Sequence, residues 1–288
     1  MDLSVYGATG IIGTYFSGLF PSFSIPREQL EPETENVLYL ISTTDNSTFI
    51  ENPHIDINTN LVELMRRLEA CRNSNVETFN FVSSWFVYGP NHVYPDEQVI
   101  CDPNGFYSIT KYAAEKLVKE YCQVFGINYR IFRLGNVYGG PDTGNQKRNA
   151  LHYLINNLRE GKDINVHTNV SRDFIHIMDT CRAMEFLCEH GYTNCIYNVG
   201  TGLSTKLTKA LDKAKKIGGF HGQVHHHSVP QNYNQAVSFG LNCGKLASHG
   251  FKLLISFEEG LLDLCLNQKF CTPDRTLMEQ KLKQRLPA

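Results

Sequence analysis

One glycine-rich stretch near the start of the chain, DLSVYGATGIIGTYFSGLF at residues 2–20, constrains the fold most. A short β-type run breaks at Gly7, glycines recur at Gly10 and Gly13, and an apolar helix-like segment follows. A strand, a glycine turn and a helix in this order begin a βαβ unit that binds dinucleotides. The turn brings backbone close to a pyrophosphate, and the helix N-terminus offers it free N–H groups. We expect the cofactor to contact Gly7, Thr9, Gly10, Ile11, Ile12 and Gly13.

Strands and helices alternate along the first half of the chain. The alternation predicts an α/β fold, a doubly wound parallel sheet of the Rossmann type with ligands at the carboxyl ends of its strands. The link between residues 27 and 37 is too short for a full helix, so we expect an open adenine side. The expected strands span residues 22–28, 37–42, 78–82 and 129–134, and the expected helices begin at 14 and span 60–71 and 106–125.

The pattern changes at Gly139, where a polar loop begins and the elements become shorter. We expect a dinucleotide-binding domain at residues 1–138, to which segments at about 173–200 return, and a smaller, mainly substrate-binding region at 139–288. The run His225–His227 is predicted to be a solvated loop rather than a metal site. The expected elements here are helices at 150–159, 179–189 and 256–266, the last with a Ser256/Glu259 capping box, and strands at 164–166 and 196–199.

Composition sets limits on location and partners. A formal charge of −2 over 288 residues gives no reason to expect nucleic acid or an acidic membrane as a partner. Apolar runs such as VLYLI are far too short to span a bilayer. Nine cysteines without CxxC pairing, and no secretory signal, favour reduced thiols in the cytoplasm.

Tyr107 and Lys111 share one face of the expected helix because they are four residues apart. A phenol is a poor acid or base at neutral pH, and a nearby ammonium favours its ionised form. We therefore expect Lys111 to bring Tyr107 into working range as a general acid/base, although the same spacing also occurs on solvated helix faces. The preceding strand ends at Ser83 and Ser84, where a parallel sheet places its ligands.

These motifs together resemble the extended short-chain dehydrogenase/reductase family, in its nucleotide-sugar epimerase, dehydratase and reductase branch. The resemblance runs from GATGIIG to about Gly202 and more weakly to residue 260, through SSWFVYG, YSITK, RLGNVYGGPD, SRDFIHIMD and YNVGTG. It implies that Tyr107 is the general acid/base, with Lys111 as its partner. Counting back from VYG favours Ser84 over Ser83 as the hydroxyl that orients the substrate. For the cofactor, the resemblance implies Asn58, with Asn60 as a rival, and we add Ser42.

The same resemblance implies a substrate site for a nucleotide diphosphate sugar. Asn136 and Arg172 occupy the family's diphosphate-binding positions, and a guanidinium suits diphosphate oxygens. A surface ion pair between Arg172 and Asp173 is the structural alternative. We add Trp85, and Arg148 on the loop as a further basic candidate.

Two departures from the family narrow the reaction. Dehydratases of the family carry an Asp-Glu pair where this chain has Trp85 and Phe86, which cannot exchange protons, so we predict no 4,6-dehydratase activity. After the second strand stand Arg27 and Glu28, where NAD-preferring members have an acidic residue. We favour NADP(H) over NAD(H) because Arg27 comes first, while Glu28 suits an NAD ribose.

The preferred interpretation is reduction of a 4-keto deoxysugar nucleotide, with Tyr107 giving the proton and Ser84 polarising the carbonyl. The alternatives are a nucleotide-sugar 4-epimerase with tightly held NAD and a non-catalytic dinucleotide-sensing protein. We expect a homodimer formed through the helices at 60–71 and 106–125, unless their apolar residues face only the sheet of their own chain.

Overall fold

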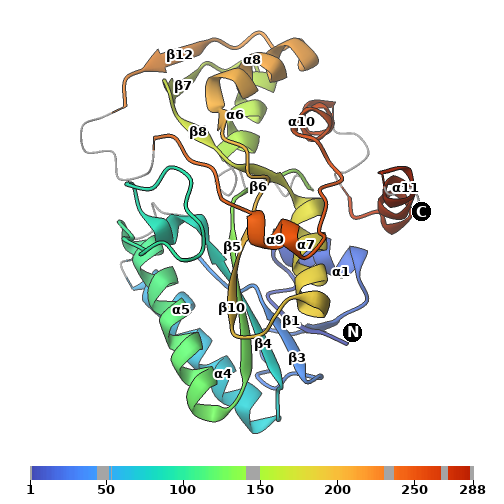
Figure 1. The fold of residues 1–288 in the computed structure, drawn as a ribbon. Coiled ribbons are helices and arrows are strands. Elements are labelled where there is room, and N and C mark those ends of the chain that lie inside the picture. The colour runs from blue at the N-terminus through green and yellow to red at the C-terminus, as the bar shows by residue number, and fades with distance from the viewer. Residues whose placement is uncertain are drawn as a thin grey trace.

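Six parallel strands form the central sheet, in the order β10-β5-β4-β3-β1-β2 (Figure 1). The computed structural model describes residues 2–43, 52, 54–140, 150–229, 237–266 and 272–285. The predicted doubly wound parallel sheet is confirmed, and its strand order changes direction between β1 and β3, where such sheets bind ligands. The strands are β1 (Ser4–Tyr6), β2 (Phe23–Ile25), β3 (Asn36–Tyr39), β4 (Thr78–Ser84), β5 (Asn128–Leu134) and β10 (Cys195–Val199).

Helices cover both faces of the sheet. On one face α1 (Ile11–Leu19) and α7 (Ile177–His190) pack on strand residues such as Val5 and Leu38. On the other face α4 (Glu63–Asn73) and α5 (Phe106–Phe125) pack on Tyr39 and Phe79. Each fully buried side chain of this size contributes about 1.5–3 kcal/mol, so both layers are held mainly by apolar burial. The short helix α3 (Ile55–Ile57) and one π-helical turn, η1 (Asn58–Val62), lead into α4.

The link between β2 and β3 contains no helix, as the sequence predicts. Residues 26–35 instead run across the sheet beside β1, where the Ser4 hydroxyl oxygen accepts from the backbone N–H groups of Glu33 and Thr34 at 2.9 and 3.0 Å. The buried Arg67 guanidinium donates to the carbonyl oxygens of Arg27 and Gln29. These contacts hold the link in place of helix packing.

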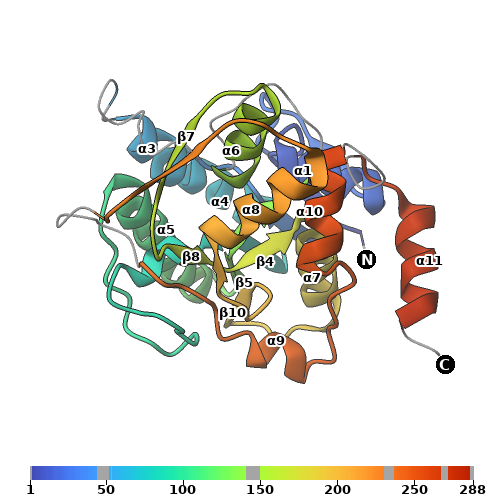
Figure 2. The same cartoon turned by 90° about the horizontal axis from the view of Figure 1, so that it is seen from above.

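A smaller region lies beyond the carboxyl ends of the sheet strands, at the top of Figure 1 and facing the viewer in Figure 2. Its own apolar core includes Leu151, Ile155, Leu211 and Leu261. Its elements are β6 (Asn136–Tyr138), α6 (Ala150–Arg159), β7 (Ile164–His167), β8 (Ser171–Arg172), β9 (Phe174–His176), β11 (Thr205–Lys206), α8 (Leu207–Gly218), β12 (Val224–His227) and α10 (Phe257–Leu266).

One expectation for the second half was wrong. His225–His227 is not a loop: it belongs to β12, which pairs in parallel with β7. Two helices there were not predicted, α8 at residues 207–218 and α11 (Arg275–Arg285), which follows α10. The expected capping box is present, with the Glu259 N–H donating to the Ser256 hydroxyl at 3.2 Å. None of the helices in the described part is both long and apolar enough to cross a bilayer.

Candidate active site

The glycine turn joins β1 to α1 as predicted. Gly7 has φ of +82°, a left-handed conformation that suits glycine, and its carbonyl accepts from the Gly10 N–H at 3.0 Å. A Cβ on Gly13 would lie 2.7 Å from the Ala8 Cα and even closer to the Gly7 carbonyl oxygen. The turn is therefore a close-packed cradle with no room for a side chain at Gly13. It leads into the N-terminus of α1. Such a cradle fits the pyrophosphate of a dinucleotide.

Three hydroxyl groups from three separate segments meet at the carboxyl edge of the sheet. Ser84 ends β4, Ser42 follows β3, and Tyr107 lies in the first turn of α5. The side chains of Ser84 and Ser42 both act on the Tyr107 hydroxyl, because they lower its pKa against the larger raising effect of burial. A phenol held between two serine hydroxyls beside the glycine cradle is an arrangement that can move a proton to or from a substrate oxygen.

Strand alternation separates the two candidate serines. Ser83 faces the helix layer, where its hydroxyl donates to the Glu115 carboxylate at 2.6 Å, whereas Ser84 is directed to Tyr107. Glu115 also accepts two hydrogen bonds from Arg133, at 2.7 and 3.0 Å, in a fully buried pair. Glu115 is not predicted from the motifs, although it follows Lys111 by four residues on the same helix face.

The Lys111 side chain is directed at a strand carbonyl rather than at Tyr107. Its ammonium donates to the Val82 carbonyl at 2.7 Å and lies over the Phe81 ring, 4.3 Å from the ring centroid. Burial raises the pKa of Tyr107, which hydrogen bonds with the two serines lower only in part. Burial likewise lowers the pKa of Lys111 to about 7. In this structure Tyr107 is therefore held as the protonated phenol rather than shifted toward phenolate.

Of the two rival asparagines, Asn60 lies at the site and Asn58 is exposed. The π-helical turn directs the Asn60 amide at the end of β3, where it accepts from the Ser42 hydroxyl at 3.1 Å and the Thr43 N–H at 3.0 Å. Its amide nitrogen donates to the Thr110 hydroxyl on α5 at 3.0 Å. Asn60 thus joins the β3 edge to the helix that carries Tyr107.

Aromatic rings connect the tyrosine to the candidate phosphate-binding arginine. Phe86 meets Tyr107 edge to face with ring centroids 5.8 Å apart, and stacks on Trp85 at 4.2 Å. The Arg172 guanidinium lies over Trp85, 5.2 Å from its ring centroid. Phe86 is partly exposed whereas Trp85 is buried, so Phe86 presents an apolar ring beside Tyr107.

The structural alternative for Arg172, an ion pair with Asp173 at the surface, is not found in the described part of the chain. Asp173 is fully buried and accepts from Thr201, Gly202 and Leu241 backbone N–H groups at 2.8–3.1 Å. Arg172 donates to the Ser171 carbonyl at 2.7 Å. The buried Asn136 side-chain nitrogen has no hydrogen-bond partner, as expected of a donor that a ligand would satisfy. Arg148 lies outside the described residues.

The residues at the adenosine end are exposed. Arg27 and Glu28 follow β2 with their side chains in solvent, so either is accessible to a cofactor ribose.

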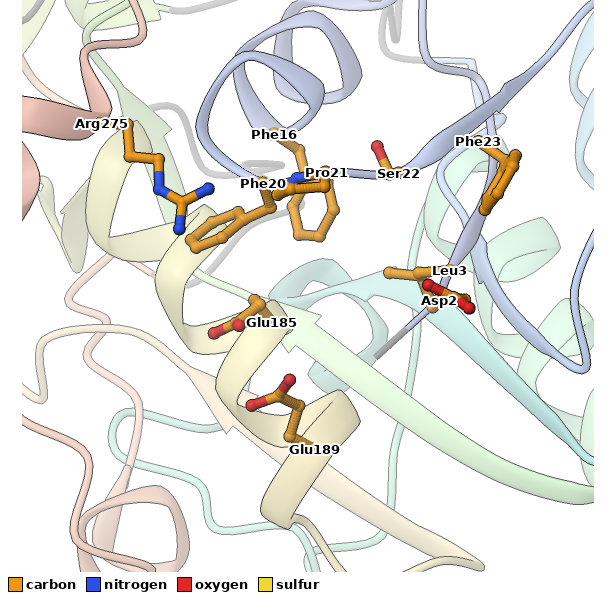
Figure 3. A pocket seen from close by; sticks show the side chains of 10 residues that line it. All are labelled: Asp2, Leu3, Phe16, Phe20, Pro21, Ser22, Phe23, Glu185, Glu189 and Arg275. Atoms are coloured by element: carbon orange, nitrogen blue, oxygen red, sulfur yellow. The ribbon is translucent and has the colours of Figure 1, made fainter.

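A separate cavity of about 460 Å³ lies at the opposite end of the strands (Figure 3). It has an aromatic wall of Phe16, Phe20 and Phe23, while Glu185 and Arg275 are among its polar residues. Because it opens at the start of β1 and β2, it is remote from the carboxyl edge that carries Tyr107.

Comparisons with known proteins agree with this geometry. A family model described as the NAD-dependent epimerase/dehydratase family matches residues 31–200. A putative UDP-glucose 4-epimerase of Methanocaldococcus jannaschii is 28% identical over 233 residues, 80% of this chain and 75% of that protein. A UDP-glucose 4-epimerase of Thermotoga maritima, solved with UDP-glucose, has a TM-score of 0.81 at 21% identity and covers 97% of this chain and 100% of its own. RMD from Pseudomonas aeruginosa, solved with NADPH, has a TM-score of 0.80 at 22% identity, with coverages of 92% and 98%. The structural likenesses show a shared fold.

Proposed function

The chain belongs to the NAD-dependent epimerase/dehydratase family, and from that premise we propose that it exchanges a hydride and a proton with a carbinol or ketone carbon of a nucleotide sugar. The observation that carries this proposal is the meeting of Tyr107, Ser84 and Ser42 beside the glycine cradle. A dinucleotide held on that cradle supplies or takes up the hydride. Tyr107 gives or accepts the proton at the sugar oxygen, and Ser84 holds that oxygen by a hydrogen bond.

Reduction of a 4-keto deoxysugar nucleotide is our first candidate. Burial keeps the Tyr107 proton in place, which suits a group that must donate it. The adenosine end is bordered by the short β2 and a link without a helix, so it offers little surface for holding a cofactor permanently. A reductase must exchange its cofactor in every turnover, whereas an epimerase retains it.

Epimerisation at C4 is the second candidate, and the similar proteins favour it. The Methanocaldococcus jannaschii relative and the Thermotoga maritima structure are both described as 4-epimerases. The same residues serve both reactions, since epimerisation is an oxidation followed by a reduction on the other face of the sugar. Tyr107 would then accept a proton before donating it.

For the cofactor we propose NADP(H) over NAD(H). Arg27 is exposed directly after β2 and can pair with a ribose 2′-phosphate, while the neighbouring Glu28 would repel one. RMD was solved with NADPH, whereas other similar structures contain NAD, so the neighbours leave both cofactors open.

For the substrate we propose that Arg172 and Asn136 bind the diphosphate, with Trp85 holding the arginine from behind. Arg148 stays a candidate from the sequence. We further propose a cytoplasmic homodimer. Apolar side chains stay exposed along one side of α5, at Ile109, Leu117 and Val124, which is the surface two copies would bury. Sedimentation of Val124→Glu against the unaltered chain tests the dimer.

The deciding experiment is cofactor analysis of the purified protein, followed by turnover assays. We expect a protein that binds NADPH more tightly than NADH, loses bound cofactor on dialysis, and reduces 4-keto-6-deoxy sugar nucleotides. NAD that resists dialysis, with interconversion of C4 epimers, would replace the reductase by the epimerase. Unchanged activity in Tyr107→Phe would overturn both.

A further inference from the structure

The link between β2 and β3 begins with a tight turn. The Gln29 N–H donates to the Pro26 carbonyl at 3.2 Å, so Arg27 and Glu28 are the two central residues of a β-turn. Both of their side chains are exposed. Because β1 and β2 pair in parallel and end level with each other, this turn lies beside the start of the glycine turn. The two residues that can choose between cofactors therefore share one β-turn next to the glycine cradle.

A buried guanidinium on α4 holds this β-turn. Arg67 is only 1% exposed, its Nη2 donates to the Arg27 carbonyl at 2.6 Å, and its Nη1 donates to the Gln29 carbonyl. Its Nε donates to the Glu63 carboxylate at 2.7 Å, so the buried charge is paired. The Arg27 carbonyl belongs to the peptide that joins the two central residues of the turn. The hydrogen bond to it therefore fixes the orientation of that peptide.

Tyr6 of β1 completes the attachment. Its ring lies under Arg67, with the guanidinium carbon 4.9 Å from the ring centroid, and its hydroxyl donates to the Leu30 carbonyl. The carbonyls at positions 27, 29 and 30 are thus all bound by buried side chains. Because these hydrogen bonds reach only the backbone, they hold the link without engaging the Arg27 and Glu28 side chains.

The attachment depends on the shape of the guanidinium as well as on its charge. A guanidinium carries donors on both terminal nitrogens in a planar fork, so it can bind two carbonyls while its third nitrogen pairs with a carboxylate. A lysine ammonium has the same charge but is a single point on a flexible stem. Arg67→Lys therefore separates the geometry of the attachment from its charge.

We propose that Arg67 is a positioning residue for cofactor selectivity, which acts by fixing the β-turn that carries Arg27 and Glu28. This inference rests on the cofactor site proposed above and deepens it. With the turn fixed, Arg27 meets a ribose 2′-phosphate in one geometry, whereas a loose turn lets Glu28 reach the same place. Arg67 itself touches neither cofactor nor substrate in this assignment.

The test compares the dissociation constants of the full chain for NADPH and NADH, measured by fluorescence titration. We expect the unaltered chain to prefer NADPH, and Arg67→Lys to reduce this preference by about three- to tenfold, the effect of weakening one charged contact at an exposed site. Arg66→Lys makes the same substitution one position earlier, at an exposed side chain of α4, and should leave the preference unchanged.

Two further measurements separate positioning from a general loss of structure. Reduced nicotinamide mononucleotide lacks the adenosine half of the cofactor, so it should bind equally well to Arg67→Lys and to the unaltered chain. The Arg27→Ala variant lacks the group that is to be positioned. In that background Arg67→Lys should change the ratio of the two dissociation constants by less than about twofold.

Three results would overturn the inference and leave the proposed function intact. The first is an unchanged ratio in folded Arg67→Lys. The second is weaker binding of NADPH, NADH and the mononucleotide by one common factor, which indicates a purely structural role. The third is equal affinity of the unaltered chain for both cofactors, since the turn would then select nothing. A chain that binds neither dinucleotide would overturn the proposed function together with the inference.

The inference stands apart from the choice of NADP(H). If the unaltered chain prefers NADH, that choice is wrong, and a ratio that Arg67→Lys moves toward one still supports the role of Arg67. Should Arg67→Lys fail to fold by circular dichroism, Tyr6→Phe decides. It keeps the ring under the guanidinium and removes only the hydroxyl that binds the Leu30 carbonyl, so it should move the ratio in the same direction. An unmoved ratio in Tyr6→Phe would then overturn the inference.

Discussion

The Lys111 ammonium donates to the carbonyl oxygen of Val82 at 2.7 Å, at the floor of the site. The bond fixes the side chain between α5 and β4, and burial lowers the pKa of Lys111 to about 7. This lysine is thus a buried cation that is close to its titration point at neutral pH.

Lys111 should make stability depend on pH in a definable way. The pKa is about 7 in the folded state against 10.5 for a free lysine, so the folded protein loses this proton first as the pH rises. Below about pH 7 both states hold the proton and the cost of burial is fully present; above it, stability increases by at most about 1.4 kcal/mol per pH unit. Lys111→Met should therefore exceed the unaltered chain in unfolding free energy most at low pH. Urea unfolding across this range measures the difference, and a constant difference would contradict the assignment.

Breaking the Glu115–Arg133 pair should be costly. Glu115→Gln leaves the Arg133 guanidinium buried without its counter-charge, and we expect a loss of about 3–5 kcal/mol in unfolding free energy. Glu120→Gln, on the exposed side of the same helix, should change stability by less than about 0.5 kcal/mol. Denaturant unfolding measures the unfolding free energy of both variants. Equal losses would show that the buried ion pair contributes no more to stability than an exposed glutamate.

Gly13→Ala should abolish dinucleotide binding. The added Cβ meets the backbone of Gly7 and Ala8, which cannot move without opening the turn. Ser17→Ala, farther along α1, is the matched control and should bind normally. Fluorescence titration with NADPH measures both, and normal binding by Gly13→Ala would remove the cofactor from this turn.

The aromatic pair should exclude dehydration. Trp85 and Phe86 stack with ring centroids 4.2 Å apart and have no group that exchanges protons. Incubated with nucleotide-activated hexoses and cofactor, the protein should form no 4-keto-6-deoxy product by mass spectrometry. A loss of 18 mass units, the water removed in dehydration, would refute the assignment of these two residues.

The sheet and its main helices were predictable because their apolar periodicity is strong. Helix α5 has the predicted bounds, since glycines at 105 and 126 border its periodic run. Helix α8 was not predicted, although Ala210, Leu211 and Ala214 recur at helical spacing on its buried side, opposite a face rich in lysine. Strand β12 escaped because its histidines are exposed, and only its pairing with β7 defines it.

At the site, the order of the motifs predicted which residues lie close together. It did not predict the directions of their side chains. Tyr107 and Ser84 meet as expected. Asn58 and Asn60 differ in sequence by only two positions, and the π-helical turn decides which one points inward. The direction of the Lys111 side chain depends on a carbonyl in another element, which sequence spacing does not encode.

The apolar cluster that packs against α1 joins segments that are far apart in the sequence, so it can be completed only late in synthesis. Leu3, which precedes β1, and Val5 of β1 share one apolar cluster with Leu254 and with Met278 of α11. At roughly 5–20 residues per second, the ribosome delivers Met278 more than ten seconds after Leu3. The strand that leads into the glycine turn is thus synthesised well before the helix that completes its apolar cluster. Until then its apolar side chains depend on chaperones, or on transient partners within the nascent chain, for protection from aggregation.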